Sequence, residues 1–304
     1  MTAERRNWLD VAESGGVYGV RIIVWLATVF GRAPARAVLK VVALYYALTH
    51  ATARRASREW LAKVRGPGAQ VQFRDVYSHV LAFAETALDR LFFVQRDFGH
   101  FEVTHTGHEH LAKLAAERKG AILLGAHLGS FEALRMQGDA HRIPINVLGY
   151  FKNARFWNRA LEALAPGANV RLISVDAASI DFIFKVKACI ERGELVAVLG
   201  DRVGLGGDTV EAELFGAPAR FPSGAYLLAA SLGCPIYFTV GLYRSPNRYE
   251  LYCEPFAEEV IVPRKARKPA LAAYAAQYAN RLEHYGRLAP DNWFNFFDFW
   301  RDGK

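Results

Sequence analysis

The chain has 304 residues, of which 52% are apolar and 22% charged, with three cysteines and a net charge of +8. This length suffices for one large domain or two small ones with a sizeable core, and the composition excludes a disordered chain. The three scattered cysteines lack a CxxC spacing, which excludes a disulfide framework and a paired-cysteine zinc site and indicates a reducing compartment.

The positive charge is concentrated at the amino-terminal end. Residues 1–70 hold 11 Lys and Arg against 4 Asp and Glu, whereas residues 71–304 hold 27 against 26. The basic segment contains two uncharged runs, residues 22–31 and 41–53, and each is too short to span a bilayer. Apolar runs with basic flanks are typical of helices in a membrane interface, so we expect an anionic membrane surface as partner and no nucleic acid. A core helix pair with a solvated basic face is the alternative.

The chain beyond residue 70 alternates between helical and strand patterns. Residues 71–98 carry apolar side chains at spacings of three and four, which predicts a helix. The predicted strands are residues 121–126, 145–150, 170–175, 195–200 and 236–241, with 249–253 as an edge strand. The other predicted helices are residues 130–140, 154–164, 180–192, 224–232 and 270–288.

Strands that are apolar throughout and alternate with helices predict an α/β fold with a mainly parallel central sheet flanked by helices. We expect residues 1–70 to form a basic, amphipathic, membrane-associating helical segment that packs on or leads into a catalytic domain of residues 71–304. The two parts are expected to make one structural domain overall.

Several common catalytic motifs are absent. The sequence has no GxSxG, no GxxxxGK[ST] and no complete GxGxxG after a strand, which excludes the hydrolase nucleophile elbow and the usual nucleotide cradles. His105, His108 and His110 form the cluster HTGHEH, which we expect to be a loop entering a helix because no complementary Cys/His spacing accompanies it. We expect no metal and no cofactor.

His127 directly follows the predicted strand 121–126, in GAHLGSFEALR, and Glu132 comes five residues later. On one continuous helix, residues five apart point about 140° away from each other. The two side chains can therefore meet only if His127 lies in the turn before a helix and Glu132 lies in its first turn. Gly129 permits such a turn, and Ser130 is suited to cap the helix.

Asp201 follows the predicted strand 195–200 as His127 follows its own strand. Both side chains are therefore expected at the carboxyl edge of the sheet, where open α/β sheets bind their ligands. An isolated histidine is more often a satisfied core residue, but this paired placement at one edge favours a functional site.

At His127 and Glu132 the spacing His-x4-Glu resembles that of the lysophospholipid acyltransferase superfamily, and within it the bacterial lipid A biosynthesis (lauroyl/myristoyl) acyltransferases. The likeness covers roughly residues 20–300. The other segments that carry it are the region of Asn153 and Asn158, the GDR of Gly200–Arg202, the loop FGAPARFPSG of Phe215–Gly224 and the aromatic tail of Trp293–Trp300. Arg202 stands where glutamine is expected in the lipid A enzymes, so the acceptor is left open.

The resemblance implies an acyltransferase that moves a fatty acyl group from an acyl thioester, on acyl carrier protein or coenzyme A, to a hydroxyl of a lipid or glycolipid. It implies His127 as general base, oriented by Glu132, with no acyl-enzyme intermediate. The substrate-binding residues that we expect are Arg135, Asn153, Asp201, Arg202 and Arg220. The expected location is the cytoplasmic face of the bacterial inner membrane, with peripheral or monotopic attachment.

Two alternatives stay open. The first is a catalytically silent lipid-binding or scaffold protein with the same fold. The second is a metal-dependent hydrolase that uses His127, Asp201 and the HTGHEH cluster. The tail of residues 293–300 has six aromatic side chains in eight positions, for which we expect core packing that closes an acyl tunnel.

Overall fold

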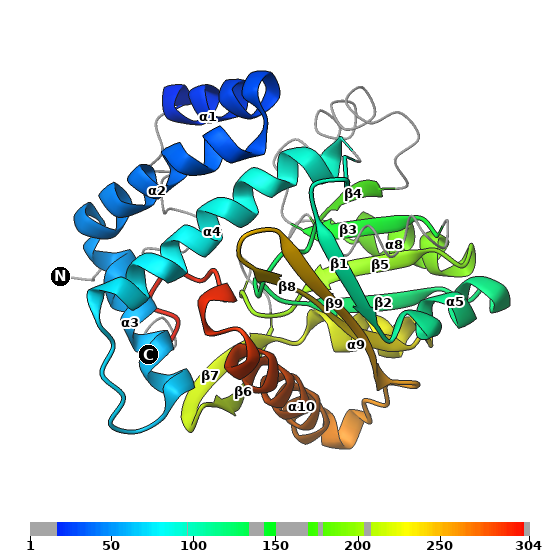
Figure 1. Ribbon diagram of the computed structural model, residues 1–304. Coiled ribbons are helices and arrows are strands. Elements are labelled where there is room, and N and C mark those ends of the chain that lie inside the picture. Colours follow the sequence, from blue (N-terminus) through cyan, green and yellow to red (C-terminus); the bar gives the residue numbers. More distant parts are fainter. Residues whose placement is uncertain are drawn as a thin grey trace. The chain divides into compact units, whose positions relative to one another are not determined.

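The computed structural model describes residues 17–95, 97–133, 143–149, 170–175, 179–203 and 208–300. The chain divides into two compact units (Figure 1). The helical unit comprises residues 1–91 and 285–304, and the sheet unit comprises residues 92–284. The predicted segment of residues 1–70 lies wholly in the helical unit, and its role as a separate segment stays a prediction.

Four helices and a short 3-10 turn form the described part of the helical unit. They are α1 (Val17–Phe30), α2 (Arg32–Thr49), α3 (Ala51–Arg65), α4 (Phe73–Val94, of which residues up to 91 belong here) and η3 (Pro290–Asn292). The predicted helix of residues 71–98 is confirmed as α4. Within the described ranges, no helix combines the length and apolar character that crossing a membrane requires.

α2 packs on α4 through a stripe of small side chains. Ala43 and Ala47 lie one helical turn apart on α2 and form a buried cluster with Val76 and Val80 of α4. Besides Arg32 and Leu39, the buried residues of α2 are alanines.

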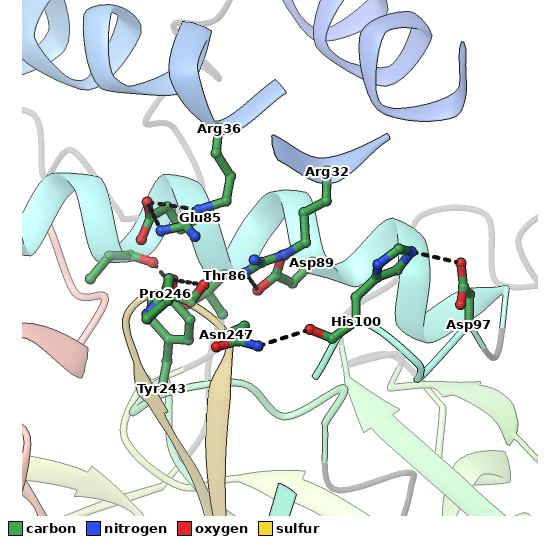
Figure 2. A network of polar contacts seen from close by, with 11 residues as sticks. Arg32, Arg36, Glu85, Thr86, Asp89, Asp97, His100, Tyr243, Pro246 and Asn247 are labelled. Carbon is green, nitrogen blue, oxygen red and sulfur yellow. Dashed lines mark hydrogen bonds and ion pairs between the residues drawn. The ribbon is translucent and has the colours of Figure 1, made fainter. Parts of the chain in front are cut away.

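Two ion pairs fix the same helix pair (Figure 2). The Arg32 Nε lies 2.6 Å from Asp89 Oδ1, and the Arg36 Nε lies 3.0 Å from Glu85 Oε1. Asp89 and Glu85 are almost fully buried. Removing one partner of a buried pair leaves an uncompensated charge, which typically costs about 3–5 kcal/mol.

The aromatic tail packs inside the helical unit, as expected. The Trp293 ring lies 4.2 Å from that of Trp60 on α3, and both residues are 1% exposed. The Trp60 Nε1 donates a hydrogen bond of 2.7 Å to the Pro290 carbonyl. Core packing is therefore confirmed for Trp293, whereas closure of an acyl tunnel stays a prediction.

A seven-stranded sheet forms the centre of the sheet unit, in the order β1-β9-β8-β2-β5-β3-β4 (Figure 1). The strands are β1 (Glu102–Thr106), β2 (Ala121–Gly125), β3 (Ile145–Gly149), β4 (Val170–Ser174), β5 (Leu195–Leu199), β8 (Ile236–Arg244) and β9 (Arg248–Ala257). β2, β3, β4, β5 and β8 run parallel, whereas β9 is antiparallel to β8 and parallel to β1. The predicted mainly parallel sheet is confirmed.

Two strand predictions need correction. β9 was expected at the edge of the sheet, but it lies between β8 and β1. The edge strand next to β9 is β1, whose residues are mostly exposed and therefore lack the apolar run by which the other strands of this sheet were found. The expected loop over residues 215–224 contains half of a β-hairpin, formed by β6 (Thr209–Leu214) and β7 (Ala217–Pro222).

The remaining described elements of the sheet unit are helical. They are α5 (His108–Glu117), α8 (Asp181–Glu191), α9 (Gly224–Leu232), η2 (Arg264–Ala266) and α10 (Arg267–Leu288, of which residues up to 284 belong here). α8, α9 and α10 confirm the predicted helices of residues 180–192, 224–232 and 270–288. The predicted helix of residues 154–164, and that of residues 130–140 from residue 134 on, lie outside the described residues.

Helices cover both faces of the sheet. Leu123 of β2 belongs to a buried cluster with Leu114 of α5. The next residue, Leu124, points to the opposite face, where it pairs in register with Phe238. The Phe238 ring lies 5.9 Å from that of Tyr278 on α10. α5 and α10 therefore cover opposite faces, and the carboxyl edge of the parallel strands carries the polar residues considered next.

Candidate active site

The pairing of β2 with β5 brings His127 and Asp201 together. Gly125 and Leu199 are register partners at the carboxyl ends of these two strands. His127 and Asp201 each lie two residues beyond that pair, so they leave the sheet side by side. The expectation that both project from the same edge is confirmed.

Asp201 holds His127 at two points. The carboxylate Oδ1 lies 2.8 Å from ring Nδ1, and the backbone N–H of His127 donates to Oδ2 at 3.0 Å. A carboxylate only accepts, so Nδ1 carries the proton. In a neutral ring Nε2 is then left with a lone pair, which is the form that a general base needs.

The two partners differ in burial. The Asp201 side chain is fully buried, whereas the His127 side chain is 25% exposed. Burial, the largest influence, would by itself raise the pKa of Asp201. The positive charge and hydrogen bonds of His127, together with the charge of Arg202, outweigh burial and hold the pKa of Asp201 below its usual value. Asp201 is therefore an anion that can stabilise a protonated imidazole.

A tight turn after His127 is fixed against β8. Gly129 has a φ of +74°, and a Cβ built on it would lie 2.0 Å from the carbonyl oxygen of Gly241. The backbone N–H of Ser130 donates to the same oxygen at 2.7 Å. The Ser130 Oγ accepts a hydrogen bond of 3.1 Å from the backbone N–H of Ala133. The predicted turn at Gly129 is confirmed. The helix that Ser130 was expected to cap lies outside the described residues from residue 134 on, so its capping role stays a prediction.

The carboxylate that contacts Nδ1 of the His127 ring is Asp201, and the expected orientation of His127 by Glu132 stays a prediction. Glu132 follows the turn, and its Oε2 lies 3.5 Å from the Ser130 Oγ. The physical reason for the contact with Asp201 is sheet topology, because the adjacency of β2 and β5 places Asp201 against Nδ1 although 74 residues separate it from His127. A catalytic role for Glu132 stays a prediction.

Tyr278 is a supporting residue that the sequence did not reveal. Its hydroxyl donates a hydrogen bond of 2.8 Å to the carbonyl of Gly125, at the end of β2. Burial, and then the negative charge of Asp201, raise the pKa of Tyr278 well above its ordinary value, so the phenol stays protonated. A Cβ on Gly200 would lie 2.8 Å from Leu124 Cδ1 and 3.2 Å from the Tyr278 ring. Gly200 therefore lets this ring approach the strand that leads to Asp201.

Of the other predicted substrate-binding residues, the structure describes Arg202 and Arg220. Arg202 follows Asp201 and adds positive charge beside it. Arg220 lies on β7, where its Nε is 3.2 Å from Glu211 Oε1 across the hairpin. Arg135 and Asn153 lie outside the described residues. The roles of all four residues in substrate binding stay predictions.

The HTGHEH cluster is divided between a strand and a helix. His105 lies on β1, and His108 and His110 lie in the first turn of α5, so the expected loop is a short strand-to-helix connection. Across the part of the chain that the structure describes, no group of three His, Cys, Asp or Glu side chains could hold a metal ion.

Comparison with protein families identifies the family of the chain. A family model described as "Bacterial lipid A biosynthesis acyltransferase" matches residues 6–302. No curated protein matches the chain. The match spans both His127 and Asp201, together with both compact units.

Proposed function

The chain belongs to the family of bacterial lipid A biosynthesis acyltransferases and is an acyltransferase, and we propose that it transfers a fatty acyl group at His127 and Asp201. The donor is an acyl thioester on acyl carrier protein or coenzyme A, and the acceptor is a hydroxyl of a lipid or glycolipid. The reaction takes place at the cytoplasmic face of the bacterial inner membrane, where such a donor and a membrane lipid can meet.

The single observation that carries the proposal is the contact between His127 Nδ1 and Asp201 Oδ1 at 2.8 Å, with the ring still partly exposed. Asp201 keeps the proton on Nδ1, so Nε2 can accept the proton of an acceptor hydroxyl. As Nε2 becomes protonated, the buried carboxylate stabilises the new positive charge.

The reaction then needs no acyl-enzyme. The deprotonated hydroxyl oxygen attacks the thioester carbonyl and forms a tetrahedral intermediate with a negatively charged oxygen. When this intermediate collapses, the carbon–sulfur bond breaks and the thiolate takes the proton from Nε2. Arg202 is proposed to stabilise the negative oxygen, and Arg135, Asn153 and Arg220 are proposed to bind substrate groups.

The test is His127→Ala in the full chain. We expect acyl transfer to fall by roughly 10²–10⁴-fold, the usual contribution of a general base, while the unfolding midpoint stays within a few degrees. His105→Ala is the matched control, because His105 is an exposed histidine of the same unit. Transfer should be followed by mass spectrometry of the acylated lipid, with acyl carrier protein and coenzyme A thioesters compared as donors.

Equal transfer by His127→Ala and His105→Ala would contradict the proposal. Transfer that disappears in excess chelator and returns with a divalent metal would instead favour metal-dependent chemistry. Membrane lipids extracted from cells with and without the protein would then identify the acceptor by the mass of the added acyl chain.

A further inference from the structure

The hydroxyl of the fully buried Tyr278 lies at the ends of both strands that lead to the candidate active site. The carbonyl oxygen of Gly125, at the end of β2, accepts the backbone N–H of Gly200 at 2.9 Å and the Tyr278 hydroxyl at 2.8 Å. A carbonyl oxygen has two lone pairs, so these two donors satisfy it. His127 follows Gly125 by two residues, and Asp201 follows Gly200 by one. The Gly125 oxygen is therefore a shared anchor for both strand ends, and Tyr278 is the side chain that holds it.

The missing side chain of Gly200 makes room for this contact. A Cβ on Gly200 would lie 2.8 Å from Leu124 Cδ1, and 3.2 Å and 3.3 Å from Cζ and the hydroxyl oxygen of Tyr278. Gly200 does not have a positive φ, so its backbone conformation does not require glycine. The close approach of the Leu124 and Tyr278 side chains does require it. The residue before Asp201 is thus one that admits the phenol.

Two other buried rings hold the ring of Tyr278. The Phe221 ring lies edge-to-face with it, with 5.5 Å between the ring centroids, and the Phe238 ring of β8 lies 5.9 Å away. All three residues are 0% exposed. An edge-to-face contact favours one orientation of a ring over others. Phe221 belongs to β7 and to the segment FGAPARFPSG, so this segment helps to aim the phenol at Gly125.

The phenol remains a neutral donor beside Asp201. Burial, and second the negative charge of Asp201, raise the pKa of Tyr278 well above its ordinary value. A hydroxyl that keeps its proton and donates it to a backbone carbonyl does not exchange protons with a substrate. Any contribution of Tyr278 to the reaction therefore comes through the position of other groups.

We propose that Tyr278 is a positioning residue for acyl transfer, which fixes the distance between the ends of β2 and β5 and so holds His127 Nδ1 against Asp201 Oδ1. That contact, at 2.8 Å, lies beyond the last register pair of the two strands. A misplacement of about 1 Å at a reacting group can lower a rate by roughly 10²-fold. Phe221 acts one step further out, by orienting Tyr278. The inference rests on the proposed function, because it gives Tyr278 a part in the same reaction.

The first test is Tyr278→Phe in the full chain, which keeps the ring and removes only the hydroxyl. We expect kcat of acyl transfer to fall by roughly ten- to a hundredfold and KM to stay within about twofold, because the substitution moves the histidine but leaves substrate contacts in place. The control is Tyr243→Phe. Tyr243 is also buried, and its hydroxyl donates to the Pro246 carbonyl at 3.0 Å within the hairpin of β8 and β9. The control loses the same kind of hydrogen bond, and its kcat should match that of wild type.

A double-mutant cycle separates positioning from a general loss of stability. In protein that carries Asp201→Asn the contact with His127 is already broken, so adding Tyr278→Phe should lower kcat by less than about twofold further. A defect that acted through folding alone would lower kcat by the same factor in both backgrounds. Phe221→Leu should lower kcat by less than Tyr278→Phe does, and this loss should disappear in protein that carries Tyr278→Phe.

The Nδ1 proton of His127 gives a measurement that needs no substrate. A ring proton in a hydrogen bond to a carboxylate resonates far downfield in proton NMR, and His127→Ala assigns the signal by its loss. We expect the signal to persist in Tyr243→Phe and to shift or broaden in Tyr278→Phe. If Tyr278→Phe does not fold, Phe221→Leu is measured in its place, with a smaller change expected in both the signal and kcat.

Three results would overturn the inference. Tyr278→Phe could keep the wild-type kcat and the His127 signal while His127→Ala loses transfer, which would leave the proposed function standing without a role for Tyr278. Equal losses of kcat from Tyr278→Phe with and without Asp201→Asn would make Tyr278 a residue of the core only. Full transfer by His127→Ala would contradict the proposed function itself, and the role of Tyr278 with it.

Discussion

His127 and His79 are two histidines held by hydrogen bonds within different units of the protein. His79 is fully buried in the helical unit, where its Nε2 lies 2.8 Å from the Trp293 carbonyl and its Nδ1 2.9 Å from the Ser57 Oγ. The carbonyl only accepts, so the proton is on Nε2 of His79. In His127 the proton is on Nδ1, facing Asp201.

The difference decides what each ring can do. A protonated His79 would be a buried charge beside a serine and a carbonyl, and burial, opposed by the bond to Trp293, lowers the pKa of His79 to about 4. A protonated His127 lies against a buried carboxylate and near solvent. His79 therefore connects α3, α4 and the aromatic tail, whereas His127 has the surroundings of a group that gains and loses a proton during a reaction.

We expect the largest effect on acyl transfer from the substitution Asp201→Asn. The amide can offer its NH₂ to Nδ1, which would favour the wrong tautomer and leave the protonated ring without a counter-charge. We expect acyl transfer to fall by roughly 10²–10⁴-fold with little change in substrate KM. Steady-state kinetics check this, and Ser57→Ala, which removes the oxygen at Nδ1 of His79, should leave the rate of folded protein unchanged. If Asp201→Asn and Ser57→Ala lowered the rate of acyl transfer equally, the inferred difference in role between His127 and His79 would be wrong.

The next effect is acid destabilisation through His79. Its pKa is lower in the folded protein, about 4, than the 6.5 of an ordinary histidine, so the unfolded chain binds the proton more readily. The stability contribution is complete above pH 6.5 and is lost as the pH falls towards 4, by on the order of 3 kcal/mol.

This linkage is measured by urea unfolding from pH 7 to pH 4. His79→Gln is the comparison, since glutamine keeps hydrogen-bonding groups but does not titrate in this range. The variant should be less stable at pH 7 and should lose less stability than wild type between pH 6.5 and 4. Parallel curves for the two proteins would show that His79 does not supply the acid sensitivity.

A backbone change near His127 should have a smaller but measurable effect. Gly129→Ala places a Cβ 2.0 Å from Gly241 O at a φ of +74°, and we expect it to destabilise the protein by about 2–3 kcal/mol and to lower acyl transfer. Gly216→Ala is the control, because Gly216 has a φ of +70° with no atom within 4 Å of the added Cβ. The difference between the two losses in unfolding free energy, measured by chemical denaturation, gives the contribution of the close approach of the turn to β8. Equal losses of unfolding free energy in the two variants would mean that the turn can move away from β8 without destabilising the protein.

The smallest effect is expected for Glu132→Gln. Glutamine can still accept a hydrogen bond from Ser130, so we expect transfer to fall by about tenfold, less than for Asp201→Asn. Kinetics of the two variants under the same conditions compare the two carboxylates directly. If Glu132→Gln lowered acyl transfer as much as Asp201→Asn does, Glu132 would be as important to the function of His127 as Asp201 is.

Most strands of the sheet could be predicted because each is a short apolar run, as in β2 and β5, whose burial on both faces demands such residues. β1 escaped prediction because an edge strand of largely exposed residues has no such pattern. The turn at Gly129 was also predictable, since glycine adopts a positive φ without strain and is therefore a local signal of a tight turn.

The sequence by itself determined the alternation of strands and helices, the edge at which His127 and Asp201 emerge and, through the family match, the acyltransferase assignment. These follow from local patterns and from the order of residues along the chain. Only the tertiary structure decided that Asp201 is the partner of the His127 ring, that Tyr278 supports the end of β2 and that α2 turns its larger apolar side chains outward. The reason is that strand order and helix packing bring together residues that are far apart in the chain. The free energy that favours one strand order and one helix packing comes from many contacts between distant segments, and no short segment contains these contacts.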